Sequence, residues 1–469
     1  MSAGVADTLF LPVAELAGRI KSRSVSPVEL AEFYLSRGEA LGPRYNAYAM
    51  LTAARARAAA DKAKREIDAG HYRGPLHGVP YAAKDLLAVR GYPTTWGAAP
   101  YATQQFDYDA TVIEKLDRAG AVLIGKAAMI ELAGGMGYRF ASASLTGPGK
   151  NPWNTNCWTC GSSSGSAAIV AAGLAPFAIG TETWGSILCP SSFCGITGLR
   201  PTFGRVSRWG AMALAYSMDK IGPLARTAED AALVLEAIAG PDARDRSSLP
   251  PGQAEFRARE AVPTRPLRIA RLTNAWEKPS PEIASAADNA LKLLGQQGCH
   301  VEDADLPKGP WEDAGGVMIA VECASAFEDL IESGRVAKLT DPLGQINGYA
   351  YKQVSASDYV QALRVREILQ EKIDTLFEKF DVIAAPGQPI TAATLETNLE
   401  TDLSFADPLG GIGNLCGLPA IGVPCGFSSL GMPMGIQFLA RVRNDAAVVS
   451  VARFYQRHTN WHTKRPPMT

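Results

Sequence analysis

The chain has 469 residues, of which 47% are hydrophobic and 20% charged, a composition typical of a globular protein with a large core. Its 46 Lys and Arg residues balance 47 Asp and Glu residues, and the net charge of −1 excludes the basic footprint of a dedicated nucleic-acid-binding protein. No apolar stretch of about 18 residues occurs, so no membrane span is expected. The amino terminus lacks the pattern of a secretory signal, and the expected location is the cytoplasm.

Residues 11–70 are predicted to be helical. Ser26, followed by a proline and then Glu29, is typical of a helix start, because the serine side chain accepts hydrogen bonds from the first backbone N–H groups. This helix is expected to end near Leu41. A second helix, rich in Ala, Arg and Lys, is predicted over 53–69.

Strand-like and helix-like segments alternate after residue 80. The predicted strands cover 81–83, 121–125, 177–180, 267–272, 301–306 and 380–386. The predicted helices cover 110–119, 167–172, 281–297 and most of 311–380. This alternation predicts an α/β protein with a mostly parallel or mixed sheet. Residues 241–265 are polar and contain proline, so they are predicted to form a long surface connection, either between two domains or within one continuous sheet.

Eight cysteines in a chain of this length do not indicate a disulfide scaffold. Cys157 and Cys160 form a CxxC pair, but a structural zinc site needs four ligands and no second pair follows. We therefore expect no metal and interpret the cysteines as buried thiols in a reducing compartment.

Two Gly/Ser-rich turns, at 160–166 and 180–190, are the candidate sites of chemistry. Each lies between predicted elements, and unpaired backbone N–H groups at such a turn suit a developing negative charge. The spacings of known phosphate-binding loops are absent, so each turn by itself also fits a plain helix cap. Ser186 in the second turn is a candidate nucleophile.

A serine nucleophile needs a base. His77 lies in a Gly/Pro turn, and no local signature such as GxSxG supports a Ser–His–Asp arrangement. Lys84 follows an apolar strand, where burial lowers the pKa of a lysine towards a value useful for a base. By itself, Lys84 fits more readily an ordinary lysine paired with a nearby acid.

Six ordered segments together resemble the amidase signature family, over about residues 11–440. They are 78–85 (GVPYAAKD), 161–168 (GSSSGSAA), 180–187 (GTETWGSI), 193–207 (FCGITGLRPTFGRVS), 218–230 (MDKIGPLARTAED) and 414–421 (NLCGLPAI). The resemblance implies the amidase signature fold, a central mixed β-sheet flanked by helices on both faces. It also implies one domain over 1–469, comprising N-terminal helices (11–70), a Gly/Ser-rich catalytic core (71–240), the connection (241–265) and a C-terminal part (266–469).

The resemblance further implies a Ser–cis-Ser–Lys triad. Lys84 matches the family's lysine, Ser162 the bridging serine and Ser186 the nucleophile, with a cis peptide bond before Ser162. The implied oxyanion hole consists of the backbone N–H groups of Thr183, Trp184, Gly185 and Ser186. No cofactor and no metal are implied.

The chain departs from the family's usual Asp-x-Gly-Gly-Ser-Ile-Arg at three positions. Glu182 replaces Asp, Trp184 replaces Gly, and Leu188 replaces an Arg that some relatives use to pair the acid or to hold a substrate carboxylate. In the first turn, Ser164 stands where a second Gly is common. These changes favour a neutral or apolar substrate. Candidate substrate-binding residues are Met129, Gly134, Gly135, Met136 and Leu188, with Trp184 and the two methionines as candidates to line an apolar pocket.

The predicted function is therefore a serine amidohydrolase for neutral or apolar amides, with carbamates (urethanes) and esters as related substrates. The expected partner is a small-molecule amide or carbamate, with no nucleic acid and no membrane, and a homodimer is compatible with the sequence. The main alternative is the glutamine-hydrolysing subunit of a tRNA-dependent amidotransferase, against which the missing Arg at position 188 argues. A non-catalytic binding relative is a further alternative.

Overall fold

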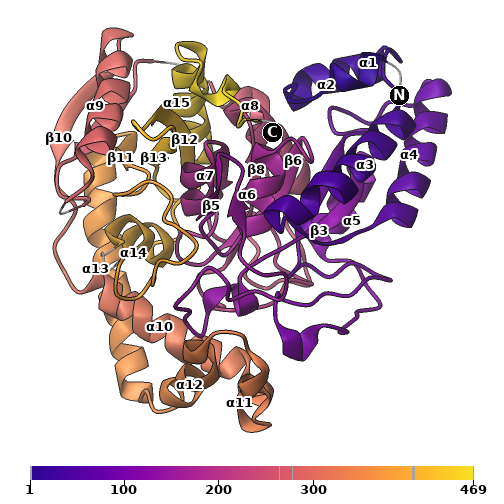
Figure 1. Cartoon of the computed structure of the whole chain (residues 1–469). Coiled ribbons are helices and arrows are strands. Elements are labelled where there is room, and N and C mark those ends of the chain that lie inside the picture. The colour runs from indigo at the N-terminus through magenta and orange to yellow at the C-terminus, as the bar shows by residue number, and fades with distance from the viewer. Residues whose placement is uncertain (1–2, 263–264, 277, 404–406, 468–469) are drawn as a thin grey trace.

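The computed structural model describes residues 3–262, 265–276, 278–403 and 407–467. Within these residues a mixed sheet of 11 strands forms the centre and helices cover both of its faces, as predicted (Figure 1). In sheet order the strands are β1 (Tyr48–Leu51), β3 (Val122–Ala127), β2 (Pro80–Lys84), β6 (Phe177–Glu182), β8 (Lys220–Ala225), β7 (Thr197–Arg200), β12 (Ala420–Phe427), β13 (Pro433–Leu439), β11 (Val382–Pro386), β9 (Arg268–Leu272) and β10 (His300–Ala304). A separate pair consists of β4 (Lys150–Asn151) and β5 (Asn154–Trp158).

The predicted helices are present with shifted bounds, whereas the helices Ala3–Ala6, Leu188–Cys194, Ala228–Ile238, Pro408–Leu415 and Asp445–Arg457 were not predicted. The α-helices are α1 (Ala3–Ala6), α2 (Val13–Lys21), α3 (Pro27–Tyr45), α4 (Ala53–Asp68), α5 (Thr111–Ala119), α6 (Ser164–Ala171), α7 (Leu188–Cys194), α8 (Ala228–Ile238), α9 (Pro281–Gln296), α10 (Trp311–Ala326), α11 (Glu328–Glu332), α12 (Pro342–Tyr351), α13 (Ala356–Lys379), α14 (Pro408–Leu415) and α15 (Asp445–Arg457). Short 3₁₀ turns are η1 (Ala99–Tyr101), η2 (Glu131–Gly134), η3 (Ala258–Glu260), η4 (Arg335–Lys338) and η5 (Trp461–Thr463).

The start of α3 follows the predicted capping signal. The Ser26 side chain accepts a hydrogen bond from the Val28 N–H at 3.2 Å, and proline occupies the first turn. The helix continues past Leu41 to Tyr45 and ends where Asn46 adopts a left-handed conformation with φ 48°.

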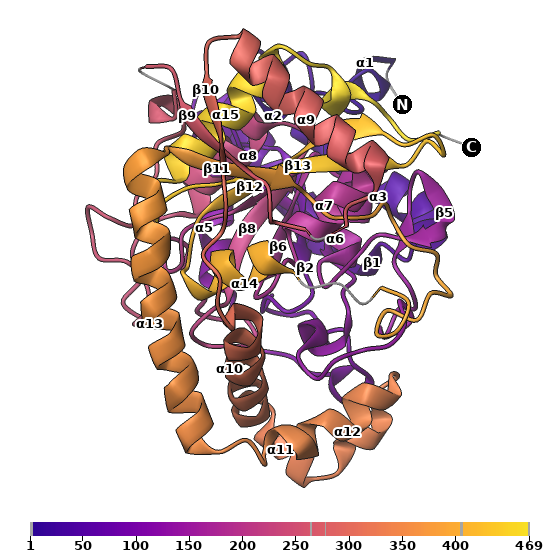
Figure 2. The same ribbon diagram turned by 90° about the vertical axis from the view of Figure 1, so that its left-hand side faces the viewer.

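Strands from both sides of the 241–265 connection belong to the same sheet. β12 pairs with β7 in an antiparallel register that places Ile421 opposite Leu199. The main sheet is therefore continuous across the connection. By contrast, the predicted helical stretch 311–380 is broken into α10–α13, which project beyond one edge of the sheet (Figure 2).

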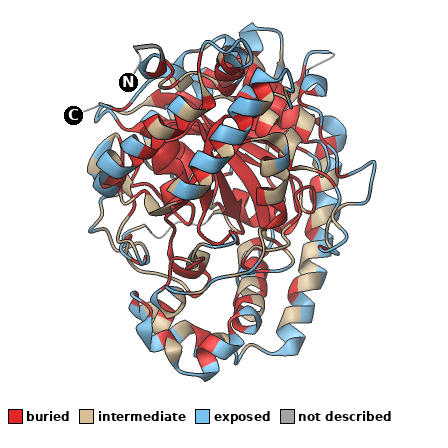
Figure 3. Ribbon diagram, turned by 90° about the vertical axis from the view of Figure 1, so that its right-hand side faces the viewer, coloured by how far each residue is buried: buried red, intermediate tan, exposed pale blue. Residues whose placement is uncertain are grey.

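The core lies between the sheet and its covering helices. Figure 3 shows the central strands buried, whereas the outer faces of the projecting helices are exposed. α6 and α7 contact each other and the strands of the sheet, and α8 and α15 form a second contacting pair. Among the described helices, none combines the length and apolar character that a membrane crossing requires.

Candidate active site

Lys84 is the last residue of β2, which lies between β3 and β6 with all three strands parallel. The carboxyl ends of parallel strands meet at one edge of a sheet, so β2 and β6 deliver their last residues to the same place. Lys84 is fully buried, and its Nζ donates hydrogen bonds to Ser162 Oγ at 2.7 Å and to Thr181 Oγ1 at 2.9 Å. The structure thus brings together the predicted base and the predicted bridging serine.

The surroundings of Lys84 favour its neutral form. Burial lowers the pKa of Lys84 to about 7, although the negative charges of Asp219 and Glu182 oppose this shift. Among the described residues, the hydrogen-bond partners of Lys84 Nζ are the neutral hydroxyl groups of Ser162 and Thr181 rather than a carboxylate that would fix the charged form. A lysine with this pKa is in part neutral at pH 7 and can accept a proton.

Ser162 lies in the turn that leads into α6. The Gly161–Ser162 peptide bond is cis, as predicted, and Cys160 before it has a left-handed backbone with φ 64°. The Ser162 side chain is buried. The backbone carbonyl of Ser162 accepts a hydrogen bond from the Ile130 N–H at 3.2 Å. The turn is therefore held both by its own backbone and by the loop after β3.

Ser186 lies in the turn between β6 and α7 and is partly exposed. Gly185 before it has φ 101°, a conformation that L side chains rarely adopt, which explains a glycine here. The four predicted oxyanion donors are consecutive residues of this turn. The Trp184 ring lies against Gly315 of α10, where an added Cβ would be 2.2 Å from the ring. Trp184 thus fills a space that Gly315 leaves open.

A buried acid anchors the end of the Ser186 turn. Glu182 Oε2 accepts the N–H groups of Ile187 at 2.9 Å and Leu188 at 3.0 Å, and Glu182 Oε1 pairs with Arg200 at 2.6 Å. Burial alone would raise the pKa of Glu182, but the Arg200 guanidinium and the two N–H groups bring it below its ordinary value. Arg200 of β7 therefore provides the cation for the acid, although position 188 carries a leucine.

Replacing Arg200 with methionine is expected to destabilise the fold by about 3–5 kcal/mol, because it leaves Glu182 as an unpaired buried charge. Urea unfolding followed by circular dichroism measures this loss. The double variant Glu182→Gln/Arg200→Met removes the charge as well and is expected to recover part of the stability. A loss below about 1 kcal/mol in the single variant would show that the pair does not hold the turn.

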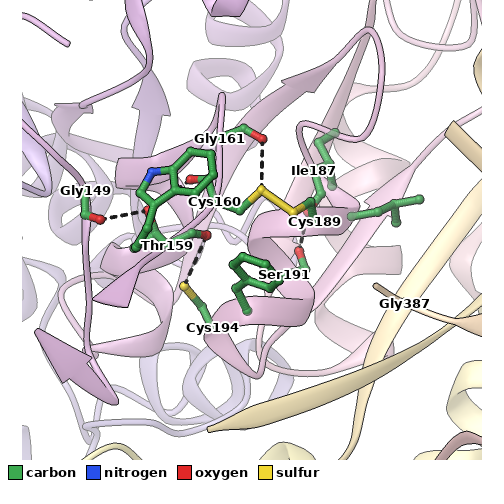
Figure 4. Close-up of a disulfide and its surroundings, with 12 residues drawn as sticks. Gly149, Thr159, Cys160, Gly161, Ile187, Cys189, Ser191, Cys194 and Gly387 are labelled. Atoms are coloured by element: carbon green, nitrogen blue, oxygen red, sulfur yellow. Dashed lines mark hydrogen bonds between the residues drawn. A yellow bond between two sulfur atoms is a disulfide. The ribbon is translucent and has the colours of Figure 1, made fainter. Parts of the chain in front are cut away.

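A disulfide joins the turn before Ser162 to the start of α7, just after Ser186, which corrects the prediction that all eight cysteines are reduced thiols. Cys160 and Cys189 form this bond, with their Cα atoms 6.0 Å apart (Figure 4). The sequence could not reveal the pair, because its members are 29 residues apart and become neighbours only when the two turns meet. The six other cysteines are free.

A cavity of about 380 Å³ lies beside Thr181 and the start of the Ser186 turn, although Lys84, Ser162 and Ser186 are not among its lining residues. Thr181, which accepts the hydrogen bond from Lys84, and Thr183, a predicted oxyanion residue, both line it. Its apolar wall includes Leu86, Ala133, Trp209, Met212, Leu214 and Ile221. Its polar wall includes Asp219, Lys220, Arg208 and, nearer the exposed surface, Arg244 and Arg246. Such a space suits a small ligand with an apolar body.

None of the five residues predicted to bind substrate is among the lining residues of this cavity. Met129, Met136 and Leu188 are buried in the core. Gly135 faces the side chain of Leu214, which lines the cavity, and Gly134 faces Tyr138. The apolar lining comes instead from Ala133, next to Gly134, and from the segment after Arg208, where the sequence suggested no pocket.

Two further residues of the site were not predicted. Thr181 is one residue of an apolar strand and becomes significant only through its hydrogen bond with Lys84. Asp219 accepts hydrogen bonds from Thr183 Oγ1 at 2.5 Å and from the Leu214 N–H at 2.8 Å, and burial raises its pKa. It belongs to the 218–230 segment that carried the family resemblance, so that segment was the available signal for it.

Comparison with known proteins gives a consistent result over nearly the whole chain. The sequence model of a family described as Amidase matches residues 29–449. A glutamyl-tRNA(Gln) amidotransferase subunit from Cupriavidus pinatubonensis is 37% identical, and the match covers 96% of this chain and 97% of that protein.

Solved structures show the same similarity in three dimensions. The peptide amidase of Stenotrophomonas maltophilia superimposes with a TM-score of 0.88 at 29% identity and covers 98% of this chain and 99% of its own. The corresponding glutamyl-tRNA(Gln) amidotransferase subunit from Thermotoga maritima superimposes with a TM-score of 0.77 at 27% identity, covering 95% of this chain and 94% of its own.

Proposed function

Because this chain belongs to the amidase signature family, we propose that it is a serine amidohydrolase that cleaves the C–N bond of a neutral or apolar amide through an acyl-enzyme on Ser186. The observation that carries the proposal is the hydrogen bond of 2.7 Å between Lys84 Nζ and Ser162 Oγ in a fully buried position. Lys84 is buried away from solvent and has a pKa of about 7, so it can act as a base. The adjacent Ser162 hydroxyl group connects this base to a proton relay.

In the proposed reaction, neutral Lys84 takes the hydroxyl proton of Ser162 while Ser162 takes that of Ser186. The Ser186 oxygen then attacks the carbonyl carbon, and the N–H groups of residues 183–186 stabilise the oxyanion, typically by about 3–4 kcal/mol for one such donor. Ser162 returns a proton to the leaving nitrogen, which matters because amines are poor leaving groups. Water hydrolyses the acyl-enzyme by the same relay.

Two features support a neutral or apolar substrate. Leu188 provides no charge beside the nucleophile, and Arg200, the buried cation behind the turn, is engaged by Glu182. The cavity next to Thr181 and Thr183 has a largely apolar wall and about 380 Å³ of space. Carbamates and esters pass through the same acyl-transfer steps and belong to the proposed substrate range.

Glutamine hydrolysis within an amidotransferase complex is the second candidate. It is supported by the 37% identity to a protein named as a component of such an enzyme. Arginines at the cavity, Arg244 and Arg246 among them, offer cations that could pair with a carboxylate, but Arg244 already pairs with Glu114 and Asp242. A non-catalytic binding role is disfavoured because Lys84, Ser162 and Ser186 are all present.

A substrate panel read as kcat/KM tests the proposal. Purified protein is offered an aryl amide, a primary aliphatic amide, an aryl carbamate and glutamine. We expect the neutral substrates to exceed glutamine by at least about tenfold, equivalent to roughly 1.4 kcal/mol of transition-state binding. Glutamine turnover that appears only with a co-purifying partner protein would support the second candidate instead.

A further inference from the structure

We propose that the Cys160–Cys189 disulfide is a reversible clamp that positions Ser162 against the Ser186 turn, so that its reduction slows acylation of Ser186. This inference rests on the proposed function of the two serines. Cys160 precedes Ser162 by two residues and Cys189 follows Ser186 by three, so the S–S bond joins the two catalytic turns directly (Figure 4).

Each half of the disulfide contacts the backbone of its catalytic turn. Cys160 Sγ lies 3.6 Å from the carbonyl oxygen of Gly161, which belongs to the peptide unit that carries the Ser162 N–H. On the other side, the Cys189 N–H donates to the Gly185 carbonyl at 2.8 Å. The Cys160 sulfur therefore contacts the peptide unit of Ser162 directly, whereas Cys189 is tied to the Ser186 turn through its backbone N–H.

The backbone conformation of Cys160 is the feature that the disulfide is proposed to stabilise. Its φ of 64° lies in the left-handed region, which residues with a Cβ other than Asn and Asp rarely adopt. With the disulfide intact, the bond to α7 holds this conformation. Once the bond is reduced, the left-handed conformation loses that support, and the turn that carries Ser162 is free to relax.

Reduction requires a thiol reagent, and the structure indicates the sulfur that it reaches. Cys189 is partly exposed, whereas Cys160 is 7% exposed. A thiolate of a small dithiol attacks Cys189 Sγ, the S–S bond breaks, and Cys160 leaves as a thiolate that takes a proton. The second thiol of the reagent then releases Cys189 as a thiol, and the reagent, having given two electrons, becomes a cyclic disulfide.

The other cysteines do not compete for this chemistry. Burial raises the pKa of all six free thiols, which keeps them protonated and weakly reactive. Redox chemistry is therefore concentrated at the pair that joins the catalytic turns.

The test compares the labelling rate of Ser186 by a fluorophosphonate in oxidised and dithiol-reduced full-length protein. We expect reduction to slow labelling by at least about tenfold, with recovery on reoxidation, since small misplacements of reacting groups have large effects on rate. A thiol count after denaturation should rise from six to eight on reduction.

Two variants distinguish a disulfide that positions Ser162 from one that only stabilises the fold. Cys160→Gly adopts the left-handed backbone without a cross-link, so its labelling is expected to be unaffected by dithiol. Cys157→Ser removes a neighbouring free thiol and should keep the full redox response. A merely structural disulfide would lower the thermal midpoint on reduction without changing the labelling rate at 25 °C.

The possible outcomes distinguish this inference from the proposed function. Equal labelling rates in both redox states, eight free thiols in air-purified protein, or a dithiol response in Cys160→Gly would each overturn the clamp and leave the proposed function intact. Absence of labelling in both redox states would instead overturn the proposed function.

Discussion

Replacement of Ser186 with alanine is expected to lower kcat by about 10⁴-fold or more and to abolish formation of the acyl-enzyme. The Ser186 Oγ is the proposed site of the covalent bond, and removing the nucleophile from a serine relay leaves only the contribution of binding and the oxyanion hole. The fold should be unaffected, because Ser186 is partly exposed in a turn and its backbone position is fixed by Gly185 and Glu182.

The measurement is intact-mass detection of the protein after exposure to a fluorophosphonate, together with turnover of an aryl amide. Ser192→Ala, a change of the same type in the adjoining helix α7, serves as the matched control and should be labelled like the unmodified protein. Labelling of Ser186→Ala at the unmodified rate would assign the nucleophile to another residue.

Replacement of Lys84 with methionine is expected to lower kcat/KM by about 10²–10⁴-fold, because the variant keeps the side-chain volume but has no proton acceptor. Lys84→Arg should be as inactive, since a guanidinium stays protonated at any working pH. Lys84→Met is expected to remain folded, since an apolar side chain of similar length suits the buried position at the end of β2. Lys84→Arg places a permanent charge in that position, so its fold is checked by circular dichroism before its activity is compared.

The pH dependence gives an independent check of Lys84. Since burial lowers its pKa to about 7, the lysine is protonated and inactive below this pH and neutral above it. In the native enzyme, kcat/KM should therefore rise about tenfold per unit as pH increases towards 7 and level off above it. Residual activity in Lys84→Met should lose this rising limb. An unchanged limb in the variant would show that another group controls the profile.

Much of the fold could be predicted from the sequence because it depends on local patterns. The apolar run before Lys84 and the apolar stretch over 177–180 appear as buried strands β2 and β6. Ser26 and its following proline begin α3 as predicted. By contrast, β1 lies within the stretch 11–70 that was predicted to be helical, since its four residues are only half-buried and show no alternation. The strands β4, β5, β7, β8, β12 and β13 were not predicted either.

The chemistry of the site could be predicted only in part from local sequence patterns. The residues by themselves left Lys84 as either a base or an ordinary paired lysine, and the resemblance to a family supplied the triad. The structure then placed Lys84 beside Ser162, which is the contact that the triad requires.

The remaining features of the site depend on contacts between distant parts of the chain. Glu182 of β6 pairs with Arg200 of β7, although β8 lies between these two strands in the sheet. Cys160 meets Cys189, and the cavity combines Thr181 with the segment after Arg208. The sequence determined which elements form, since periodicity and turn chemistry act over a few residues. Only the tertiary structure decided which side chains share a buried site, because burial and pairing depend on how the sheet brings those elements together. Burial in turn sets the pKa of Lys84.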